Sequence, residues 1–407
     1  MSNTRSKPAL IADTAIGIDP LGFAETHLSS AARAALTELQ GVLDIEVRPL
    51  LAEAWETATM PPAILQAIAP LNVMRPAGIT AEESDSSLYS GFRNYVLART
   101  DVSVATLVNA QSGLFRTTVL LGGSPEQAEQ LDPKIRDFSL AGVFALTEPE
   151  HGSDIAGGLS TTARRTGGEW VIDGTKRWIG GAVSADVIAV FARDIEDKQV
   201  KAFLVPRQAA GVTLNTIGGK IALRPMQNST ITLSGVRVPE SARLQKINSW
   251  RDVARILGAM RSDVAWIATG LQAGALDAAL TYTRGREQFG HSIGGFQLVQ
   301  EKLARMLGNL TASLGLVTQL SVRQDRGIRR DENSSLAKMW TALHARETVA
   351  LGREIAGGNG ILLSHDSARF FADAEAVYSY EGTHEVTSLI VGRALTGVSA
   401  FLPSTNY

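Results

Sequence analysis

The chain has 407 residues, of which 44% are hydrophobic and 20% are charged, and it contains no cysteine. This apolar content is enough for a large core, and the lack of cysteine excludes disulfides, thiolate nucleophiles and thiolate metal sites. Its 39 basic and 41 acidic residues leave a net charge of −2, which is not typical of proteins that bind nucleic acid or anionic membranes. We find no signal-peptide core near Met1 and no apolar run of about 18 residues, so we expect a cytoplasmic protein without a membrane span.

The first third of the chain has the apolar periodicity of helices. Ser29 or Ser30 is placed to cap a helix in which apolar residues recur every three or four positions, and Pro49 is expected to end it. Similar periodicity returns in two later stretches, 89–97 and 105–121. We therefore predict an α-helical domain at the start of the chain.

The middle of the chain, from about residue 141, has the composition of β-strands. Four short runs are rich in β-branched and aromatic residues: 186–192, 201–205, 212–217 and 230–238. Before them, apolar stretches around Trp170 and Trp178 flank Asp173-Gly174, a dipeptide that favours tight hairpin turns. We predict a compact β domain that contains a hairpin with its turn at this dipeptide.

The helical period returns after residue 250 and continues to the end of the chain. Two long stretches free of proline, 261–284 and 296–324, carry apolar stripes, and a polar loop is expected at 325–335. Further helices are predicted at 335–356 and 373–395. The order helix, strand, helix predicts an α+β protein in which both ends of the chain build a helical body around an inserted β domain.

Several common enzyme signatures are missing from the sequence. It contains no G-x-G-x-x-G after a strand, no phosphate-binding G-x-x-x-x-G-K-S/T and no G-x-S-x-G nucleophile motif. The six histidines lack the spacing of metal ligands, so we expect no metal site, and His365-Asp366 is interpreted as a helix start.

Two unusual segments lie in the β region. The first, FALTEPEHGSD from Phe144 to Asp154, forms a turn whose backbone N–H groups suit an anion or the polar edge of a ring. The alternative is a loop that leads into the domain, with a helix capped by Ser153 or Asp154. The second, KRWIG, ends at Gly180, and its Trp178 is suited either to stacking on a planar ligand or to burial in the core.

Two further segments lie in the C-terminal helical region. In RGREQFG, at 284–290, two guanidinium groups beside glycines suit a phosphate, although a solvated helix end has the same composition. In YEGTHE, at 380–385, Glu381 precedes a helix that Thr383 can cap. A carboxylate at the positive end of a helix, next to backbone N–H groups, suits proton abstraction beside a carbonyl, or it only complements the helix dipole.

Taken together and in this order, the four segments resemble the acyl-CoA dehydrogenase family, and the resemblance extends from the region of Ser30 to Phe401. The pentapeptide at 380–384 and Gly-Arg-Ala-Leu-Thr-Gly at 392–397 are most similar to the glutaryl-CoA dehydrogenase branch. The family implies an N-terminal helical domain at 1–140, a central β-barrel-like domain at 141–245 and a C-terminal four-helix bundle at 246–407. It also implies a homo-oligomer, usually a homotetramer.

The same resemblance implies non-covalently bound FAD and assigns residues to it. Those expected to face the flavin or its phosphates are Phe144, Leu146, Thr147, Ser153, Trp178, Ile179, Gly180, Thr383 and Phe401. Those expected to reach the adenosine part of FAD in a neighbouring subunit are Arg286, Gln288, Phe289, Gln297, Glu354, Gly357 and Gly358. The substrate is expected to contact Ser153, Arg261, Tyr380, Gly382 and Ala105.

The reaction that the family implies is the α,β-dehydrogenation of an acyl-CoA thioester. Glu381 would remove the α-proton while the β-hydride passes to flavin N5, which leaves a 2-enoyl thioester. Because a carboxylate is a weak base, the site must desolvate it and stabilise the enolate oxygen. The family also implies reoxidation by an electron-transfer flavoprotein.

Several positions depart from the family pattern. Some members place the base at the position of Met260, which has no basic group, so Glu381 is the remaining candidate. Ala105 stands where glutaryl-specific members have an arginine, so we expect glutaryl-CoA to be a poor substrate. Gly180 replaces a threonine or serine that binds flavin N5, and Glu354 replaces a frequent glutamine. The alternative is therefore a flavin-dependent monooxygenase or oxidase on the same fold, and a non-catalytic oligomeric binding protein is a third hypothesis.

Overall fold

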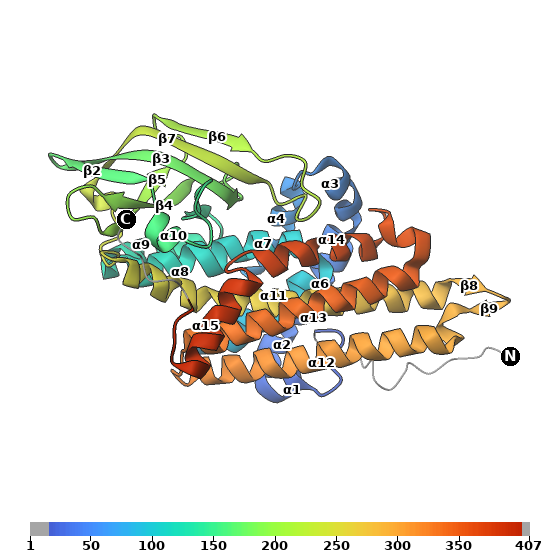
Figure 1. The fold of residues 1–407 in the computed structure, drawn as a ribbon. Coiled ribbons are helices and arrows are strands. Elements are labelled where there is room, and N and C mark those ends of the chain that lie inside the picture. Colours follow the sequence, from blue (N-terminus) through green and yellow to red (C-terminus); the bar gives the residue numbers. More distant parts are fainter. Residues whose placement is uncertain (1–15, 401–407) are drawn as a thin grey trace.

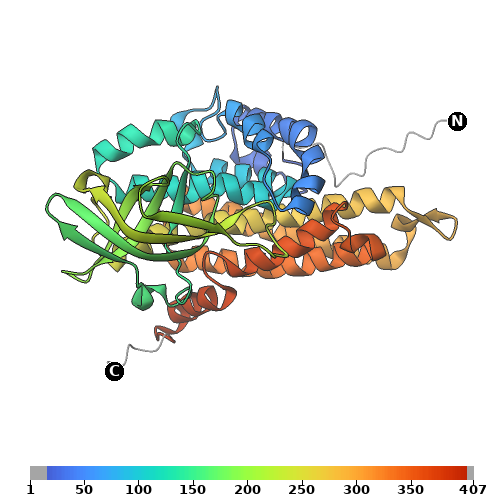
Figure 2. The same cartoon turned by 90° about the horizontal axis from the view of Figure 1, so that it is seen from above.

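The computed structural model describes residues 16–400 of the chain. A layer of long helices runs the length of the molecule, and a curled sheet lies against one end of it (Figure 1). Seen from above, helices from the first and last parts of the chain lie side by side (Figure 2). The predicted α+β class, with helical ends and a central β part, is confirmed.

The first part of the chain is helical, as predicted. Ser29 caps the second helix, because its side chain accepts a hydrogen bond of 3.1 Å from the backbone N–H of Ala32. A π-helical turn, Leu43–Val47, follows that helix, and Pro49 lies in the next 3-10 turn, Arg48–Leu50. The helices are α1 (Phe23–His27), α2 (Ser30–Val42), α3 (Leu51–Thr57), α4 (Pro62–Ile68), α5 (Ala81–Ser84), α6 (Ser87–Thr100), α7 (Val102–Asn109), α8 (Arg116–Gly122) and α9 (Pro125–Arg136).

Seven strands of the described chain form one mixed sheet in the order β1-β4-β2-β3-β7-β6, with β5 paired to β4. Their bounds are β1 (Gly142–Ala145), β2 (Thr162–Thr166), β3 (Glu169–Gly180), β4 (Val187–Asp194), β5 (Val200–Pro206), β6 (Val212–Thr216) and β7 (Asn228–Pro239), and a short helix, α10 (Ile155–Gly158), follows β1. Apolar residues such as Ile188, Phe203 and Ile231 form the inner core of the sheet. Phe191 instead packs toward the helices, in a cluster with Ile256 and Met260.

The predicted hairpin turn at Asp173-Gly174 is wrong, because β3 continues through this dipeptide as one strand. The ladder between β3 and β7 shifts its register here, and Gly174 has a φ of 152°. A side chain on Gly174 would overlap Thr161, and the Asp173 carboxylate accepts a 2.6 Å hydrogen bond from the backbone N–H of Gly235. The dipeptide therefore forms a β-bulge at which the backbone passes close to Thr161. The hairpin turn lies instead between β2 and β3.

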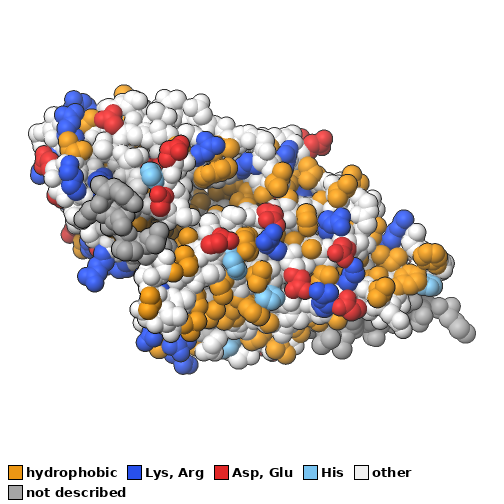
Figure 3. All heavy atoms as spheres, in the orientation of Figure 1, with side chains coloured by type: hydrophobic (Ala, Val, Ile, Leu, Met, Phe, Trp, Pro, Cys, Tyr) orange, Lys and Arg blue, Asp and Glu red, His pale blue; other side chains and the backbone are white. Residues whose placement is uncertain are grey.

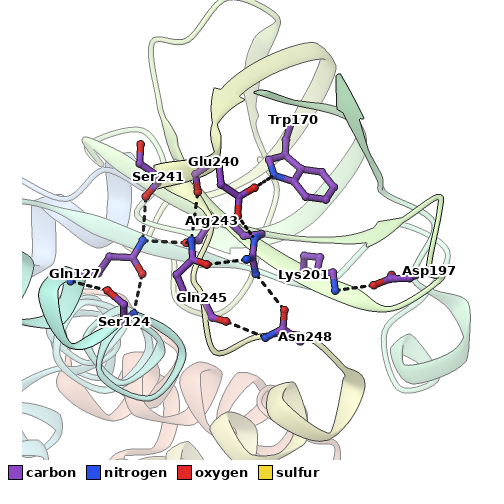
Figure 4. Close-up of polar contacts among 10 residues, drawn as sticks. All are labelled: Ser124, Gln127, Trp170, Asp197, Lys201, Glu240, Ser241, Arg243, Gln245 and Asn248. Carbon is purple, nitrogen blue, oxygen red and sulfur yellow. Dashed lines mark hydrogen bonds and ion pairs between the residues drawn. The ribbon is translucent and has the colours of Figure 1, made fainter. Parts of the chain in front are cut away.

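A polar cluster joins the sheet to α9 (Figure 4). The Gln127 side chain donates hydrogen bonds of 3.0 and 2.9 Å to the backbone oxygens of Ser241 and Arg243. Arg243 in turn pairs with Glu240 at 2.8 Å, and Glu240 accepts a 2.6 Å hydrogen bond from the Trp170 indole. These contacts fix the orientation of the β part against the helices.

The C-terminal part forms the predicted helical bundle, and three of its boundaries differ from prediction. The first helix begins at Trp250 rather than Arg261, and the third begins at Asp331, which shortens the predicted loop. The last predicted helix is divided at 380–383. The helices are α11 (Trp250–Gly285), α12 (Gln297–Asp325), α13 (Asp331–Ala356), α14 (Asp366–Ser379) and α15 (His384–Thr396), and a small hairpin, β8 (Glu287–Gln288) and β9 (His291–Ser292), extends beyond α11 (Figure 1).

One hydrophobic core joins the first and last parts of the chain. Gly91 of α6 leaves room for Trp266 of α11, and the Trp266 ring lies 4.7 Å from that of Phe92. In residues 16–400 we find no helix with the length and apolarity needed to cross a bilayer.

Candidate active site

Glu381 lies in the turn that separates α14 from α15. Glu381 and Gly382 both have a positive φ, 51° and 95°, so a helix cannot continue through them. Thr383 then caps α15 by accepting a 3.2 Å hydrogen bond from the backbone N–H of Val386, as predicted. The turn therefore places Glu381 just before the positive end of α15.

The Glu381 carboxyl group is strongly desolvated. Its Oε2 atom is buried and has no hydrogen-bond partner within the described residues. Burial raises the pKa of Glu381 to about 8, and Asp263 adds to this effect, while Lys338 and Arg261 oppose it. A carboxyl group with a pKa near the working pH is suited to act as a general base or acid.

Three charged residues surround this carboxyl group. Lys338 of α13 donates hydrogen bonds from Nζ to the backbone oxygens of Tyr378 and Gly382, at 2.9 and 2.7 Å. Arg261 of α11 forms an ion pair with Asp331, and its Nε atom is buried without a partner in the described part of the chain. Burial raises the pKa of Asp263 to about 6, with Arg93 opposing this shift.

Sequence reasoning did not find Lys338 or Asp263. Both carry a charge within the apolar stripe of a long helix, since Asp263 follows Met260 by one turn and Lys338 precedes buried Thr341 and Ala342. A charge at a buried helix position is the signal that would have found them.

Helix α7 forms one wall beside the Glu381 turn. The Tyr380 hydroxyl lies 3.4 Å from the Thr106 hydroxyl, and burial raises the pKa of Tyr380 well above its ordinary value. The next residue of α7, Leu107, lies close to Gly181. Its Cδ1 atom would be 3.3 Å from a methyl group placed on that glycine. α7 therefore reaches from the Glu381 turn to the segment that follows β3. Ala105, assigned to the substrate, is itself fully buried in the core.

The end of β3 presents an aromatic ring to solvent. The Trp178 side chain is 52% exposed, its φ is 65°, and it lies at a second register shift in β3. The Asn228 amide holds this bulge by donating a 3.2 Å hydrogen bond to the Trp178 backbone oxygen. The interpretation of Trp178 as a core residue is therefore wrong, and its ring is available to stack on a planar ligand.

Neighbours of Trp178 are packed more closely. Ile179 is buried, and a side chain added at Gly180 would overlap the Met226 methyl group. The glycine at this position is therefore matched to Met226, which occupies the space that a threonine or serine would need.

The segment after β1 is fastened to β3 by a buried ion pair. Lys176 donates to Glu148 Oε1 at 2.8 Å and to the Leu146 backbone oxygen at 3.1 Å. The backbone oxygen of Thr147 accepts a 2.8 Å hydrogen bond from the backbone N–H of Arg177. Phe144 and Leu146 point into apolar clusters, whereas Ser153 is exposed. Neither Ser153 nor Asp154 caps α10 with its side chain, and Asp154 instead lies 2.9 Å from His151 Nδ1.

The residues assigned to the adenosine part of FAD lie at the opposite end of the helical body, around β8, β9 and the end of α13 (Figure 1). All of them are exposed: Arg286, Gln288, Phe289, Gln297, Glu354, Gly357 and Gly358. Glu354 forms an ion pair with Lys302, and Phe289 is 90% exposed. A single chain does not bring this group to the Glu381 turn. Phe401 lies outside the described residues.

Comparison with known proteins identifies the family. Residues 250–396 match the acyl-CoA dehydrogenase C-terminal domain, and residues 143–236 match the acyl-CoA dehydrogenase middle domain. The chain is 33% identical to a 3-(aryl)acrylate reductase of Clostridium sporogenes, over 86% of this chain and 94% of that protein. The chain belongs to the acyl-CoA dehydrogenase family.

Solved structures of the family have the same fold. A glutaryl-CoA dehydrogenase from Mycobacterium smegmatis is 34% identical, with a TM-score of 0.86 over 94% of this chain and 99% of that one. A glutaryl-CoA dehydrogenase from the same organism, in complex with FADH2, is 31% identical, with a TM-score of 0.87 over 93% and 97%. The predicted family, fold and FAD cofactor are thereby confirmed, and the protein is an oxidoreductase that acts on CH–CH bonds.

The chain has features that fit a flavin between β3 and the Glu381 turn. Trp178 offers an exposed ring, and Glu381 has a buried oxygen without a partner in residues 16–400. Between the sheet and the helical body the surface is hollowed, and hydrophobic side chains line the hollow (Figure 3). The assignment of individual residues to FAD and substrate stays a prediction.

Proposed function

We propose that this acyl-CoA dehydrogenase removes the α-proton of an acyl-CoA thioester with Glu381. The observation that carries this proposal is the buried Oε2 of Glu381, which has no hydrogen-bond partner among residues 16–400, in a carboxyl group whose pKa is raised to about 8. Desolvation strengthens the carboxylate as a base, which is the property that a carbon acid requires.

The turn also offers a means to stabilise the enolate oxygen. The backbone N–H of Glu381 donates no hydrogen bond to any group in the described part of the chain, so it is available to the thioester carbonyl. Thr383, two residues later in the chain, is the N-cap of α15. The same turn therefore presents a base for the α-proton and a donor for the oxygen that gains charge.

FAD, when bound, accepts the hydride that leaves the β-carbon. On this chain, Trp178, the backbone at Gly180, Thr147, Ser153 and Thr383 are the groups we assign to hold it. Trp178 lies on β3 and Thr383 is the N-cap of α15, so the groups that we assign to FAD come from both the sheet and the helices.

Reduction of an α,β-unsaturated acyl group is a second candidate, because the same site serves both directions. It is favoured by the similarity to a protein named 3-(aryl)acrylate reductase. A pKa of about 8 leaves the Glu381 carboxyl largely protonated at pH 7, which suits a donor of a proton to the α-carbon.

We further propose a cytoplasmic homotetramer that passes electrons to an electron-transfer flavoprotein. Hydrophobic side chains gather over α12 and α13 (Figure 3), where Leu336 and Trp340 are each 39% exposed. The exposed residues that we assign to the adenosine part of FAD, around β8, β9 and the end of α13, also need a second chain to complete a binding site. Sedimentation of the protein and of a Trp340→Glu variant tests this, since loss of the apolar face should reduce the assembly to a smaller oligomer.

The first experiment is an anaerobic visible spectrum, recorded before and after a panel of saturated acyl-CoA thioesters is added. We expect one thioester to bleach the flavin bands, and we expect Glu381→Gln to retain FAD but lose the bleaching. Glu129→Gln is the matched control, because Glu129 is exposed on α9. Bleaching at the normal rate by Glu381→Gln would show that another group is the base.

A further inference from the structure

Lys338 is a fully buried lysine in α13, with 0% of its surface exposed. Lysine is seldom buried completely unless its charge is paired. Yet no carboxylate of the described chain lies within ion-pair distance of Lys338 Nζ, and its hydrogen-bond acceptors are the backbone oxygens of Tyr378 and Gly382. A buried cation in such a position calls for an explanation beyond packing.

The two hydrogen bonds from Lys338 lie on either side of Glu381 in the chain. Tyr378 belongs to the last turn of α14, where backbone oxygens lack intrahelical partners, and Gly382 belongs to the turn itself. One ammonium group thus ties the end of α14 to the start of α15. Glu381 lies between the two tied residues, with a φ of 51° that side-chain-bearing residues rarely adopt.

Charged groups on neighbouring elements act electrostatically on this ammonium. Glu381 lies in the turn, Arg261 on α11 and Glu385 on α15, and Asp263 on α11 acts on Glu381. Burial lowers the pKa of Lys338 to about 8, and Glu381 opposes this shift. In return, the positive charge of Lys338 lowers the pKa of Glu381.

We propose that Lys338 is the positioning residue for Glu381, holding the turn that aims the carboxylate and favouring its ionised form. This proposal rests on the role of Glu381 as the base. Because the hydrogen bonds of Lys338 go to the backbone on either side of Glu381, its effect appears in the pH dependence of the reaction as well as in the rate.

The test uses holoenzyme variants Lys338→Met and Lys338→Gln in anaerobic single-turnover reduction by the best thioester, from pH 6 to pH 9. We expect both variants to shift the acid limb upward by about one pH unit and to lower the rate at pH 7 about tenfold. Lys338→Gln retains a donor for one backbone oxygen, so its limiting rate at high pH should exceed that of Lys338→Met.

Lys201→Met is the matched control for loss of a buried lysine. Lys201 is 8% exposed in β5 and pairs with Asp197 at 2.8 Å (Figure 4). Its pH profile should equal that of the unmodified protein. A normal profile in Lys338→Gln, or loss of FAD from both Lys338 variants in proportion to the lost rate, would overturn the proposal. Normal reduction by Glu381→Gln would instead refute the base assignment itself.

Discussion

Asp263 on α11 lies close enough to Glu381, in the turn before α15, for its negative charge to raise the pKa of that carboxyl group. Burial raises the pKa of Asp263 itself to about 6. Lys338 and Arg261 act on Glu381 in the opposite direction. The pH at which Glu381 becomes a base therefore depends on a balance of charges on two helices, α11 and α13, and one turn.

Replacement of Asp263 by Asn removes the negative charge that raises the pKa of Glu381. The pKa of Glu381 should fall, and since the base acts when deprotonated, the acid limb of flavin reduction should move to lower pH. We expect the rate at pH 6 to rise about threefold, measured by single-turnover reduction across pH. Asp137→Asn, at an exposed position after α9, should leave the profile unchanged. An upward shift in Asp263→Asn would contradict this account.

Replacement of Glu148 by Gln should destabilise the fold. Glu148 is 2% exposed and accepts hydrogen bonds from Lys176, Ser160 and Thr161 at 2.6–2.9 Å. The variant leaves the Lys176 charge buried without its partner, so we expect a loss of about 3–5 kcal/mol in the free energy of unfolding, measured in urea at pH 7. Asp197→Asn, which breaks a more exposed pair, should cost less than about 1 kcal/mol.

The same pair predicts a pH dependence of stability. Burial alone would raise the pKa of Glu148, but Lys176 and the hydroxyl and backbone donors outweigh it and lower the pKa to about 2. Because the pKa of Glu148 is lower in the folded state than in the unfolded state, its ionisation stabilises the fold at pH values above about 4.3, the ordinary pKa of glutamate. This contribution is lost as the pH falls toward 2. The stability difference between the unmodified protein and Glu148→Gln should therefore shrink below about pH 4. A difference independent of pH would rule this out.

Replacement of Trp178 by Ala should weaken FAD binding without unfolding the protein. Because the side chain is 52% exposed, its removal leaves no cavity in the core. Loss of a stacking ring is worth about 1 kcal/mol, so we expect about fivefold weaker FAD binding by titration of the apoprotein. Trp178→Phe, which keeps an aromatic ring, should retain most of the affinity for FAD. Equal affinity in Trp178→Ala would place the flavin elsewhere.

Glutaryl-CoA should be a poor substrate. Ala105 and its neighbour Thr106 on α7 carry no charge, and Arg261 is already paired with Asp331. The distal carboxylate of a glutaryl group buried beside α7 would lack a cation. We therefore expect glutaryl-CoA to bleach the flavin at least about tenfold more slowly than an acyl-CoA with an uncharged acyl chain of similar length. Rapid bleaching by glutaryl-CoA would contradict this.

Much of the fold was predictable because its signals are local. The Ser29 cap, the Thr383 cap and the helix start at His365-Asp366 each depend on residues within one turn. Asp173-Gly174 was misinterpreted for the complementary reason. The dipeptide permits both a turn and a bulge, and the choice is made by Thr161 and Gly235, which lie on other segments.

The sequence by itself determined the family, the helical ends with their inserted sheet, and the glutamate placed before a capped helix. Only the tertiary structure decided that Glu381 is buried between Asp263 and Lys338, and that the Trp178 ring points outward. Charge effects depend on distance and on exclusion of water, and both arise when α11, α13 and the turn pack together. No spacing along the chain encodes them.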